Sequence, residues 1–224
     1  MALFAISDLH LALSKDKPMD VFGEKWYKHD ENIKNNWLKN ISKEDTVLIA
    51  GDISWSMNME EGIKEINWIH QLPGEKILIK GNHDYWWNSI TKLNKMHEDM
   101  HFIQNNFFAY KDIAICGTRG WLCPYSENFT EKDQKVYQRE LIRLRLSLET
   151  AKKAGYSRII SMIHYPPTND KNIETGFTEI FNEFNVEKVI YGHLHSNFQS
   201  KIANEKYILT SCDYIDFEPI KLEE

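Results

Sequence analysis

The segment Ile77-Leu78-Ile79-Lys80-Gly81-Asn82-His83-Asp84 carries most of the information about the fold. Its apolar run, residues 77–79, is rich in isoleucine and bounded by polar residues, which is typical of a buried strand. The polar residues that follow offer an amide oxygen, an imidazole and a carboxylate. The segment therefore predicts a strand whose carboxyl end carries chemically functional groups.

Four more polar motifs follow apolar runs in the same way. Helical spacing between the runs indicates the alternation of strand and helix found in α/β domains. Ligands of such sheets gather outside the carboxyl ends of the strands, so we expect the five motifs to form one site. The four are Asp8-Leu9-His10 after residues 3–6, Gly51-Asp52 after 46–50, His164 after 158–163, and Gly192-His193-Leu194-His195 after 188–191.

Together the motifs supply a nearly complete set of ligands for two transition-metal ions. Imidazoles and carboxylates without thiolates favour manganese, iron or zinc, and argue against a structural zinc knot. Gly51 allows close backbone approach, and the Asp52 carboxylate could bridge two ions about 3.5–4 Å apart. Several motifs are weak alone, since Asp-x-His or Gly-Asp is more often a simple turn. The candidate ligands are Asp8, His10, Asp52, Asn82, His164, His193 and His195.

The motif of residues 81–84 is the most specific. Asn82 is a neutral ligand, which limits the negative charge around the ions. His83 need not bind metal, so it is free to contact a phosphate oxygen and to protonate a leaving group. Asp84 either orients a neighbouring group or caps the following helix. The other histidines, His29, His70, His97 and His101, are assigned no chemistry.

The charges of this ligand set favour a phosphate substrate. Two divalent ions, two aspartates and a bridging hydroxide leave the site at about +1, which attracts an anion. Metal coordination lowers the pKa of water from about 15.7 to about 7 in the best cases. We therefore expect attack by a metal-bridging hydroxide, without a covalent enzyme intermediate.

The composition is that of an ordinary globular protein, with 224 residues, 42% hydrophobic content and a formal net charge of -6. No long run of Lys and Arg is present, which disfavours nucleic acid as the main partner. No stretch approaches the roughly 18 apolar residues that span a membrane. Three cysteines form no CxxC pair, so we expect a reduced, cytoplasmic setting. We expect a single domain over residues 1–224.

The remaining pattern predicts further helices, strands and loops. Strands beyond the motif strands imply a second sheet or a hairpin extension of the first. Three long connections, 11–28, 119–130 and 165–174, are candidates for the walls of a substrate pocket. The predicted helices are 30–41, 60–71, 86–97, 131–154 and 176–185, and the further strands are 101–108, 112–117, 198–203, 206–212 and 215–221.

The ordered set DxH, GD, GNHD, H and GHxH resembles the calcineurin-like metallophosphoesterase superfamily over residues 8–195. The resemblance implies a four-layer α/β/β/α sandwich with the metal site at the carboxyl ends of the strands. It implies His83 as the general acid or phosphate contact. It also implies that one metal is held by Asp8, His10, Asp52 and His195, and the other by Asp52, Asn82, His164 and His193.

The resemblance predicts a dinuclear metal-dependent phosphohydrolase that cleaves small phosphomonoesters or phosphodiesters, nucleotide-derived ones included. Protein phosphatases of the superfamily carry a second Asp and an Arg after Gly-Asp, whereas this chain continues Ile53-Ser54-Trp55. Lipid-A pathway hydrolases have Arg at the position of His83. Two alternatives stay open: a nuclease, although the acidic charge and the lack of a DNA-capping domain disfavour it, and a non-catalytic metal-binding scaffold.

Substrate contacts are predicted from aromatic and basic residues near the motifs. Arg119 could bind a phosphate bidentately, or form a surface salt bridge. The aromatic side chains could stack a nucleobase at roughly 1–3 kcal/mol each, or pack loops against helices. They are Trp55, Tyr85, Trp86, Trp87, Trp121 and Tyr165.

Overall fold

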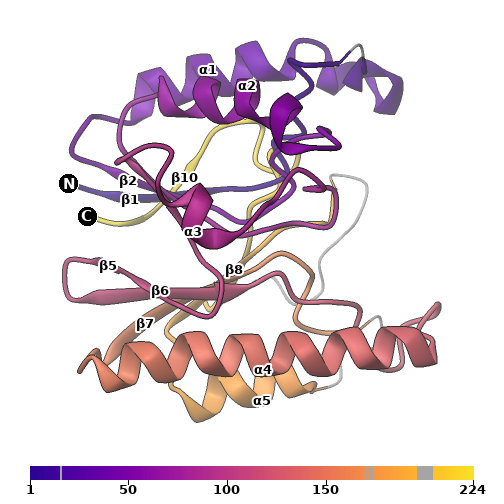
Figure 1. Ribbon diagram of the computed structural model, residues 1–224, viewed down its shortest axis with the longest axis vertical. Coiled ribbons are helices and arrows are strands. Elements are labelled where there is room, and N and C mark those ends of the chain that lie inside the picture. The colour runs from indigo at the N-terminus through magenta and orange to yellow at the C-terminus, as the bar shows by residue number, and fades with distance from the viewer. Residues whose placement is uncertain (16, 170, 172–173, 196–203) are drawn as a thin grey trace.

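Two five-stranded sheets lie face to face, and helices cover their outer faces (Figure 1). The computed structural model describes residues 1–224 except 16, 170, 172–173 and 196–203. The first sheet has the order β10 (Ile220–Glu223), β1 (Leu3–Ile6), β2 (Thr46–Ile49), β3 (Glu75–Leu78), β4 (Met100–Phe102). The second has the order β5 (Phe108–Tyr110), β6 (Ile113–Thr118), β7 (Arg158–Ile163), β8 (Lys188–Tyr191), β9 (Tyr207–Leu209).

The helices form the two outer layers, with α1 and α2 on the first sheet and α4 and α5 on the second (Figure 1). The predicted four-layer α/β/β/α sandwich is therefore confirmed, and the extra strands build a second sheet. Short elements complete the chain. The bounds are η1 (Met19–Phe22), η2 (Glu24–Trp26), α1 (His29–Asn40), α2 (Met59–His70), α3 (Ile90–Leu93), α4 (Glu131–Lys153) and α5 (Gly176–Glu183).

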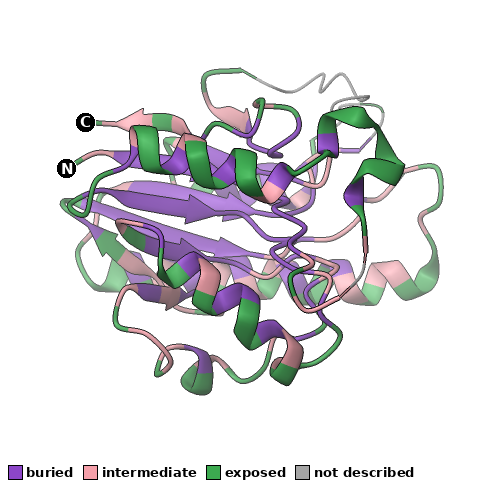
Figure 2. Cartoon of the chain, turned by 90° about the horizontal axis from the view of Figure 1, so that it is seen from above, coloured by how far each residue is buried: buried purple, intermediate pink, exposed green. Residues whose placement is uncertain are grey.

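The central strands are buried on both faces, as the inner layers of Figure 2 show. In β1, Leu3 and Ala5 join the core between the sheets, while Phe4 and Ile6 join the core beneath α1 and α2. A strand with two buried faces needs apolar residues at every position, which is why the motif strands are continuous apolar runs. None of the described helices combines the length and apolar character needed to cross a membrane.

The predicted helix over 86–97 is wrong in extent, because only Ile90–Leu93 is helical. The Trp86 side chain is buried, and its indole donates to the Asp84 carboxylate at 3.0 Å, which holds residues 84–87 in turns. The helix begins after Ser89, whose side chain caps it. Packing of the indole thus overrides the helical spacing.

The predicted strand over 101–108 is also wrong, because it is two strands in different sheets. Asn105 has a positive φ of 65°, and the Asn106 side chain accepts from the Gln104 backbone N–H at 2.6 Å. This turn separates β4 from β5 and carries the chain from one sheet to the other.

The C-terminal strand predicted over 215–221 begins only at Ile220, after turns at Asp216 and Phe217 with positive φ. The predicted strand over 198–203 lies outside the described residues. The other predicted helices agree with α1, α2, α4 and α5 to within two residues at each end.

Candidate metal centre

The five motifs leave the carboxyl ends of β1, β2, β3, β7 and β8. β1, β2 and β3 run parallel to one another, as do β7 and β8, so the ends within each set meet at one edge of its sheet. The contact between Asp52 and His164 brings the two edges together. Backbone hydrogen bonds continue beyond the strands: Asp8 N donates to Gly51 O at 2.9 Å, and Gly192 N donates to His164 O at 3.1 Å. The expected convergence of the motifs is what the structure shows.

Four candidate ligands have left-handed backbone conformations that residues other than glycine rarely adopt. The φ angles are 56° at Asp8, 45° at His10, 51° at Asp52 and 69° at His193. Such residues cluster at functional sites, where the surroundings hold a costly conformation in place. The chain here turns sharply after each strand, which aims the side chains at a common point.

Gly51 and Gly81 allow the loops after β2 and β3 to touch. A Cβ on Gly51 would lie 2.8 Å from the Gly81 backbone and 2.8 Å from His164 Nδ1. A Cβ on Gly81 would overlap the backbone and side chain of Asp52. These close approaches explain the glycine before Asp52 and the glycine before Asn82.

The first half-site comprises Asp8, His10 and His195, whose donor atoms all lie within 4.8 Å of one another. His10 Nε2 lies 3.9 Å from Asp8 Oδ1, and His195 Nε2 lies 4.0 Å from the same oxygen. The other Asp8 oxygen accepts from the hydroxyls of Ser7 at 2.6 Å and Ser211 at 3.0 Å. One carboxylate oxygen is thus fixed by hydroxyls, while the other faces the imidazoles.

The second half-site comprises Asp52, His164 and His193, again with donor atoms within 4.8 Å of one another. Asn82 joins it, since its Oδ1 lies 2.9 Å from His164 Nε2. Asp52 Oδ2 lies 3.4 Å from His164 Nε2 and 3.8 Å from His10 Nε2 of the first half-site. This oxygen therefore lies between the two half-sites, where a bridging ligand belongs.

The outward nitrogens of two histidines are held as metal ligands require. His164 Nδ1 lies 2.9 Å from Ala50 O, and His195 Nδ1 lies 2.9 Å from Asp213 Oδ1. A metal-ligating histidine commonly donates its other N–H to a carbonyl or a carboxylate, which leaves Nε2 for the ion. Donors about 3–4 Å apart can share an ion at ligand distances of roughly 2.0–2.2 Å. The donor set fits a pair of divalent ions.

Burial and neighbouring charges give the candidate ligands different protonation states. Burial lowers the pKa of His10 and of His193 to about 3, so both rings are neutral. Burial alone would lower the pKa of His164 too, but the Asp52 carboxylate raises it to about 9. Burial works against the charge on Asp52 as well, yet the His164 imidazolium keeps the pKa of Asp52 below its ordinary value. Without metal, the centre holds an imidazolium–carboxylate pair.

His83 lies at the mouth of the centre. Its Nε2 lies 4.0 Å from Asp52 Oδ2, and its side chain is 34% exposed. Its backbone N–H donates to Asp52 Oδ1 at 2.8 Å, and its ring packs on Trp55 with centroids 4.3 Å apart. Burial lowers the pKa of His83. His83 is partly open to incoming molecules, as is His195, whereas Asp8, His10, Asp52 and His164 are buried.

Asp84 does not cap α3, so that alternative is wrong. Its carboxylate accepts from the backbone N–H groups of Ile53 at 2.9 Å, Ser54 at 3.2 Å and Gly81 at 2.7 Å. Asp84 therefore ties the loop after β2 to the loop after β3, which is the orienting role. Burial raises its pKa to about 6.

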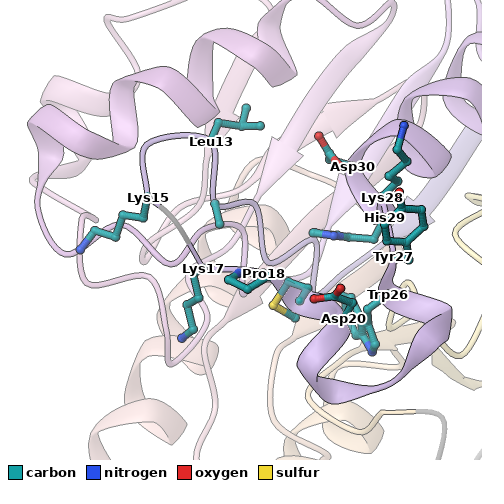
Figure 3. Close-up of a pocket in the computed structure, with 12 residues that line it drawn as sticks. Leu13, Lys15, Lys17, Pro18, Asp20, Trp26, Tyr27, Lys28, His29 and Asp30 are labelled. Carbon is teal, nitrogen blue, oxygen red and sulfur yellow. The ribbon is translucent and has the colours of Figure 1, made fainter.

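An apolar cavity of about 310 Å³ opens beside His83. The long connection 11–28 supplies Met19, Phe22 and Trp26 to its wall, and Trp55 faces them. The same connection supplies most of the lining of a second cavity of about 300 Å³, whose lining residues Figure 3 draws. This segment was predicted to be a pocket wall, and it lines both cavities.

The other aromatic candidates have mixed positions. Trp86 packs against α2 at Gly62 and is a structural residue, whereas the Tyr85 side chain is exposed. Tyr165 packs on His193, with ring centroids 4.2 Å apart, and on Trp121. Trp87 is half-buried against Phe102.

The Arg119 side chain contacts Trp121 and Glu140. Its guanidinium stacks over Trp121 and lies 3.6 Å from the buried Glu140 carboxylate. The surface salt bridge foreseen as its alternative is therefore a pair with a buried carboxylate. Substrate binding by Arg119 stays a prediction.

Sequence reasoning missed several residues of the site. Asp213 orients His195, Ser7 and Ser211 fix Asp8, and Trp26 packs edge-on to His195 at 5.6 Å. Ser211 and Asp213 follow β9 as polar residues directly after a strand, which is the signal that identified the five motifs. His70 and His97, assigned no chemistry, stack on each other beside Asp99 at the surface.

Two phage proteins are similar to this chain in sequence. The gene 66 protein of Mycobacterium phage L5 is 26% identical over 190 residues, which is 85% of this chain and 75% of that protein. The gene 66 protein of Mycobacterium phage D29 is 25% identical over 209 residues, 92% of this chain and 85% of that protein.

Two solved structures share the fold. A phosphopantetheinyl hydrolase from Mycobacterium tuberculosis matches with a TM-score of 0.60 and 13% identity, over 98% of this chain and 95% of that one. A protein of unknown function from Aquifex aeolicus matches with a TM-score of 0.54 and 19% identity, over the same shares. Residues 1–197 match the family described as calcineurin-like phosphoesterase. The chain therefore belongs to the calcineurin-like phosphoesterase family.

Proposed function

We propose that this metal-dependent phosphoesterase hydrolyses small phosphomonoesters or phosphodiesters, nucleotide-derived ones included, at a dinuclear centre bridged by Asp52. The observation that carries the proposal is the position of Asp52 Oδ2, 3.8 Å from His10 Nε2 and 3.4 Å from His164 Nε2. One oxygen is thus shared by the two half-sites, an arrangement suited to paired ions in phosphoester hydrolysis.

The two ions have separate ligands apart from this bridge. Asp8, His10 and His195 would hold one, and Asn82, His164 and His193 the other, with Asp52 common to both. When bound, the divalent pair (manganese, iron or zinc) supplies Lewis acidity, which lowers the pKa of water and offsets the charge of the phosphoryl group. The protein fixes the donor atoms in advance through Ser7, Ser211, Ala50 and Asp213.

His83 would act on the leaving group. It borders both the centre and the apolar cavity, so its imidazole can contact a phosphate oxygen on one side and an ester oxygen on the other. The lowered pKa of His83 makes its imidazolium a stronger acid than an ordinary histidine. A bound phosphate anion favours the protonated ring, which then donates its proton as the ester bond breaks.

The cavity beside His83 favours a leaving group with an apolar or aromatic portion. Trp26, Met19 and Phe22 form an apolar wall, and Trp55 lines the cavity with its ring stacked on His10 and covered by the Lys17 ammonium. A nucleobase would suit this wall. The phosphopantetheinyl hydrolase that shares the fold suggests a second ester to test.

The decisive experiment measures metal dependence and substrate preference together. The purified protein, stripped with chelator and reloaded with Mn²⁺, would be assayed on 4-nitrophenyl phosphate, its bis-ester, a 2′,3′-cyclic nucleotide, a phosphopantetheine ester, glycerol phosphate as an ester without an apolar group, and DNA. We expect turnover only after metal is restored, and lower KM for esters that carry a base or another apolar group. Turnover that survives chelation would refute the mechanism. Preference for DNA would favour the nuclease, and turnover of nothing would favour the scaffold.

A further inference from the structure

A basic pocket of about 220 Å³ lies at the same edge of the sheets as the metal centre. Lys80 enters it from the end of β3, Arg119 from the end of β6, and Arg139 and Arg143 from α4. Glu140 is the acidic residue in its wall. Four cationic side chains thus face one carboxylate, which leaves an excess of three positive charges.

The Glu140 carboxylate is already engaged. It is fully buried, accepts from the Thr118 hydroxyl at 2.6 Å, and pairs with Arg143 Nη1 at 2.8 Å. Arg119 Nη2 and Arg139 Nε lie farther away, at 3.6 Å and 3.7 Å. One carboxylate cannot satisfy three guanidinium groups, so donors remain for another anion.

Arg119 carries a buried donor with no partner. Its Nε has no hydrogen-bond acceptor among the described residues, although the atom is shielded from solvent. The guanidinium is held in place by the Trp121 ring, with 4.5 Å between the guanidinium carbon and the ring centroid. An unpaired buried donor on a fixed cation calls for an explanation, and an absent anionic ligand provides one.

The pocket adjoins the metal centre through two backbone connections. Lys80 precedes the ligand Asn82 by two residues. The Arg119 carbonyl accepts from the backbone N–H groups of His164 at 3.0 Å and Tyr165 at 3.1 Å. The backbone thus links the pocket to the half-site of Asp52, His164 and His193.

We propose that the pocket formed by Lys80, Arg119, Arg139 and Arg143 binds a phosphate group, separately from the metal ions. Planar guanidinium groups match the oxygens of phosphate, and a lysine adds a point charge. The phosphate belongs either to a substrate that carries a second phosphate or to a free anion. Binding itself does not depend on the proposed hydrolysis.

The test uses Mn²⁺-loaded full-length protein and inorganic sulfate as the phosphate analogue, titrated by calorimetry at constant ionic strength. The Arg139→Gln/Arg143→Gln variant should bind sulfate about tenfold more weakly, or worse, because charge-assisted hydrogen bonds are lost. Arg139→Gln alone keeps the Arg143–Glu140 pair and should weaken binding severalfold without disturbing the fold.

The matched control is Arg145→Gln, on the same helix but paired with Glu183 outside the pocket. It should bind sulfate like the wild type. Equal affinity in all four proteins, or no sulfate binding at all, would overturn the proposal. Neither result would bear on hydrolysis, which is measured separately.

Kinetics then identify the source of the phosphate. If the pocket receives part of the substrate, sulfate raises the KM of a bisphosphorylated substrate but not that of 4-nitrophenyl phosphate. If the ligand is a free anion, sulfate changes kcat for both substrates without competing. Either pattern supports the pocket, and the Arg139→Gln/Arg143→Gln variant should lose it. A pattern unchanged in that variant would contradict it.

Discussion

The two sheets contribute different chemistry to the candidate centre. The first sheet supplies both carboxylates, Asp8 and Asp52, whereas the second supplies imidazoles such as His164 and His193. Each half-site nevertheless draws on both sheets, since His195 joins Asp8 and His164 joins Asp52. Both anionic ligands thus come from the first sheet, which also supplies His10 and Asn82, while the other three histidine ligands come from the second sheet, so bound ions would join the two sheets.

The largest break in this arrangement is expected from Asp52→Asn. It removes the charge shared by both half-sites, so kcat/KM should fall by about 10⁴-fold, the loss for several kcal/mol of transition-state stabilisation. Metal content, measured by mass spectrometry, should fall towards one ion per chain. Asp112→Asn, an exposed change at the opposite end of β6, is the control. Two retained ions with full activity would show that Asp52 is no bridge.

His83→Ala removes an imidazole that lies near both half-sites but is a candidate ligand in neither. Loss of a general acid should lower kcat by about 10²–10⁴-fold while both ions stay bound. An ester whose leaving group needs no protonation should lose much less. His101→Ala removes a surface imidazole that pairs with Glu75 and should change nothing. Equal losses on good and poor leaving groups would rule out proton donation.

Asp213→Asn removes the carboxylate that orients His195, a candidate metal ligand of the second sheet. Without the carboxylate, the His195 ring loses the partner that fixes its orientation, and metal affinity should fall about 10–100-fold. Excess Mn²⁺ should restore activity, which a folding defect would prevent. Asp216→Asn, on the same segment but at the surface, should keep wild-type affinity. Unaltered affinity in Asp213→Asn would contradict the orienting role.

The smallest expected effect is the pH dependence of metal affinity, which depends on the ion pair between Asp52 and His164. In the metal-free protein the pKa of His164 is about 9, above its ordinary 6.5, so the ring keeps a proton through neutral pH. A metal ion must displace that proton, so its apparent affinity should rise about tenfold per pH unit up to roughly pH 9 and then level off. Calorimetry in buffers of different ionisation enthalpy should detect about one released proton per chain. Affinity independent of pH would refute the imidazolium assignment.

The same pair affects the metal-free fold with a definite sign. Because folding raises the pKa of His164, the stability it contributes is complete below pH 6.5 and is lost as pH rises through 9. Thermal unfolding of chelator-treated protein, followed between pH 6 and 9.5, measures this loss.

The family resemblance implied the four layers, while the sequence pattern left a second sheet or a hairpin extension open. The pattern predicted the motif edge well, because burial on both faces imposes continuous apolar runs and parallel strands bring their ends together. It failed where a side chain decides the backbone. Trp86 turns residues 84–87 away from a helix, and Asn106 ends a strand so that the chain can change sheets. Neither contact leaves a periodic signal.

Within the site, the candidate ligands were predictable because they directly follow strands. The residues that pack against the ligands or orient them were not predictable. Trp26 lies in a connection with no periodic pattern, and only the folded chain brings it beside His195. The role of Arg119 depends on α4, since Glu140 and Arg143 reach it from a helix far along the sequence. Such long-range contacts cannot be read from spacing.

The left-handed backbone at Asp8, His10, Asp52 and His193 has a consequence for engineering. Residues in this conformation each cost about 1–3 kcal/mol, and glycine would relieve part of that cost at every one of the four positions. Ion binding offsets the cost only when metal is present. A selection for thermostability conducted in chelator would therefore discard the ligands first, whereas the same selection with Mn²⁺ would retain them.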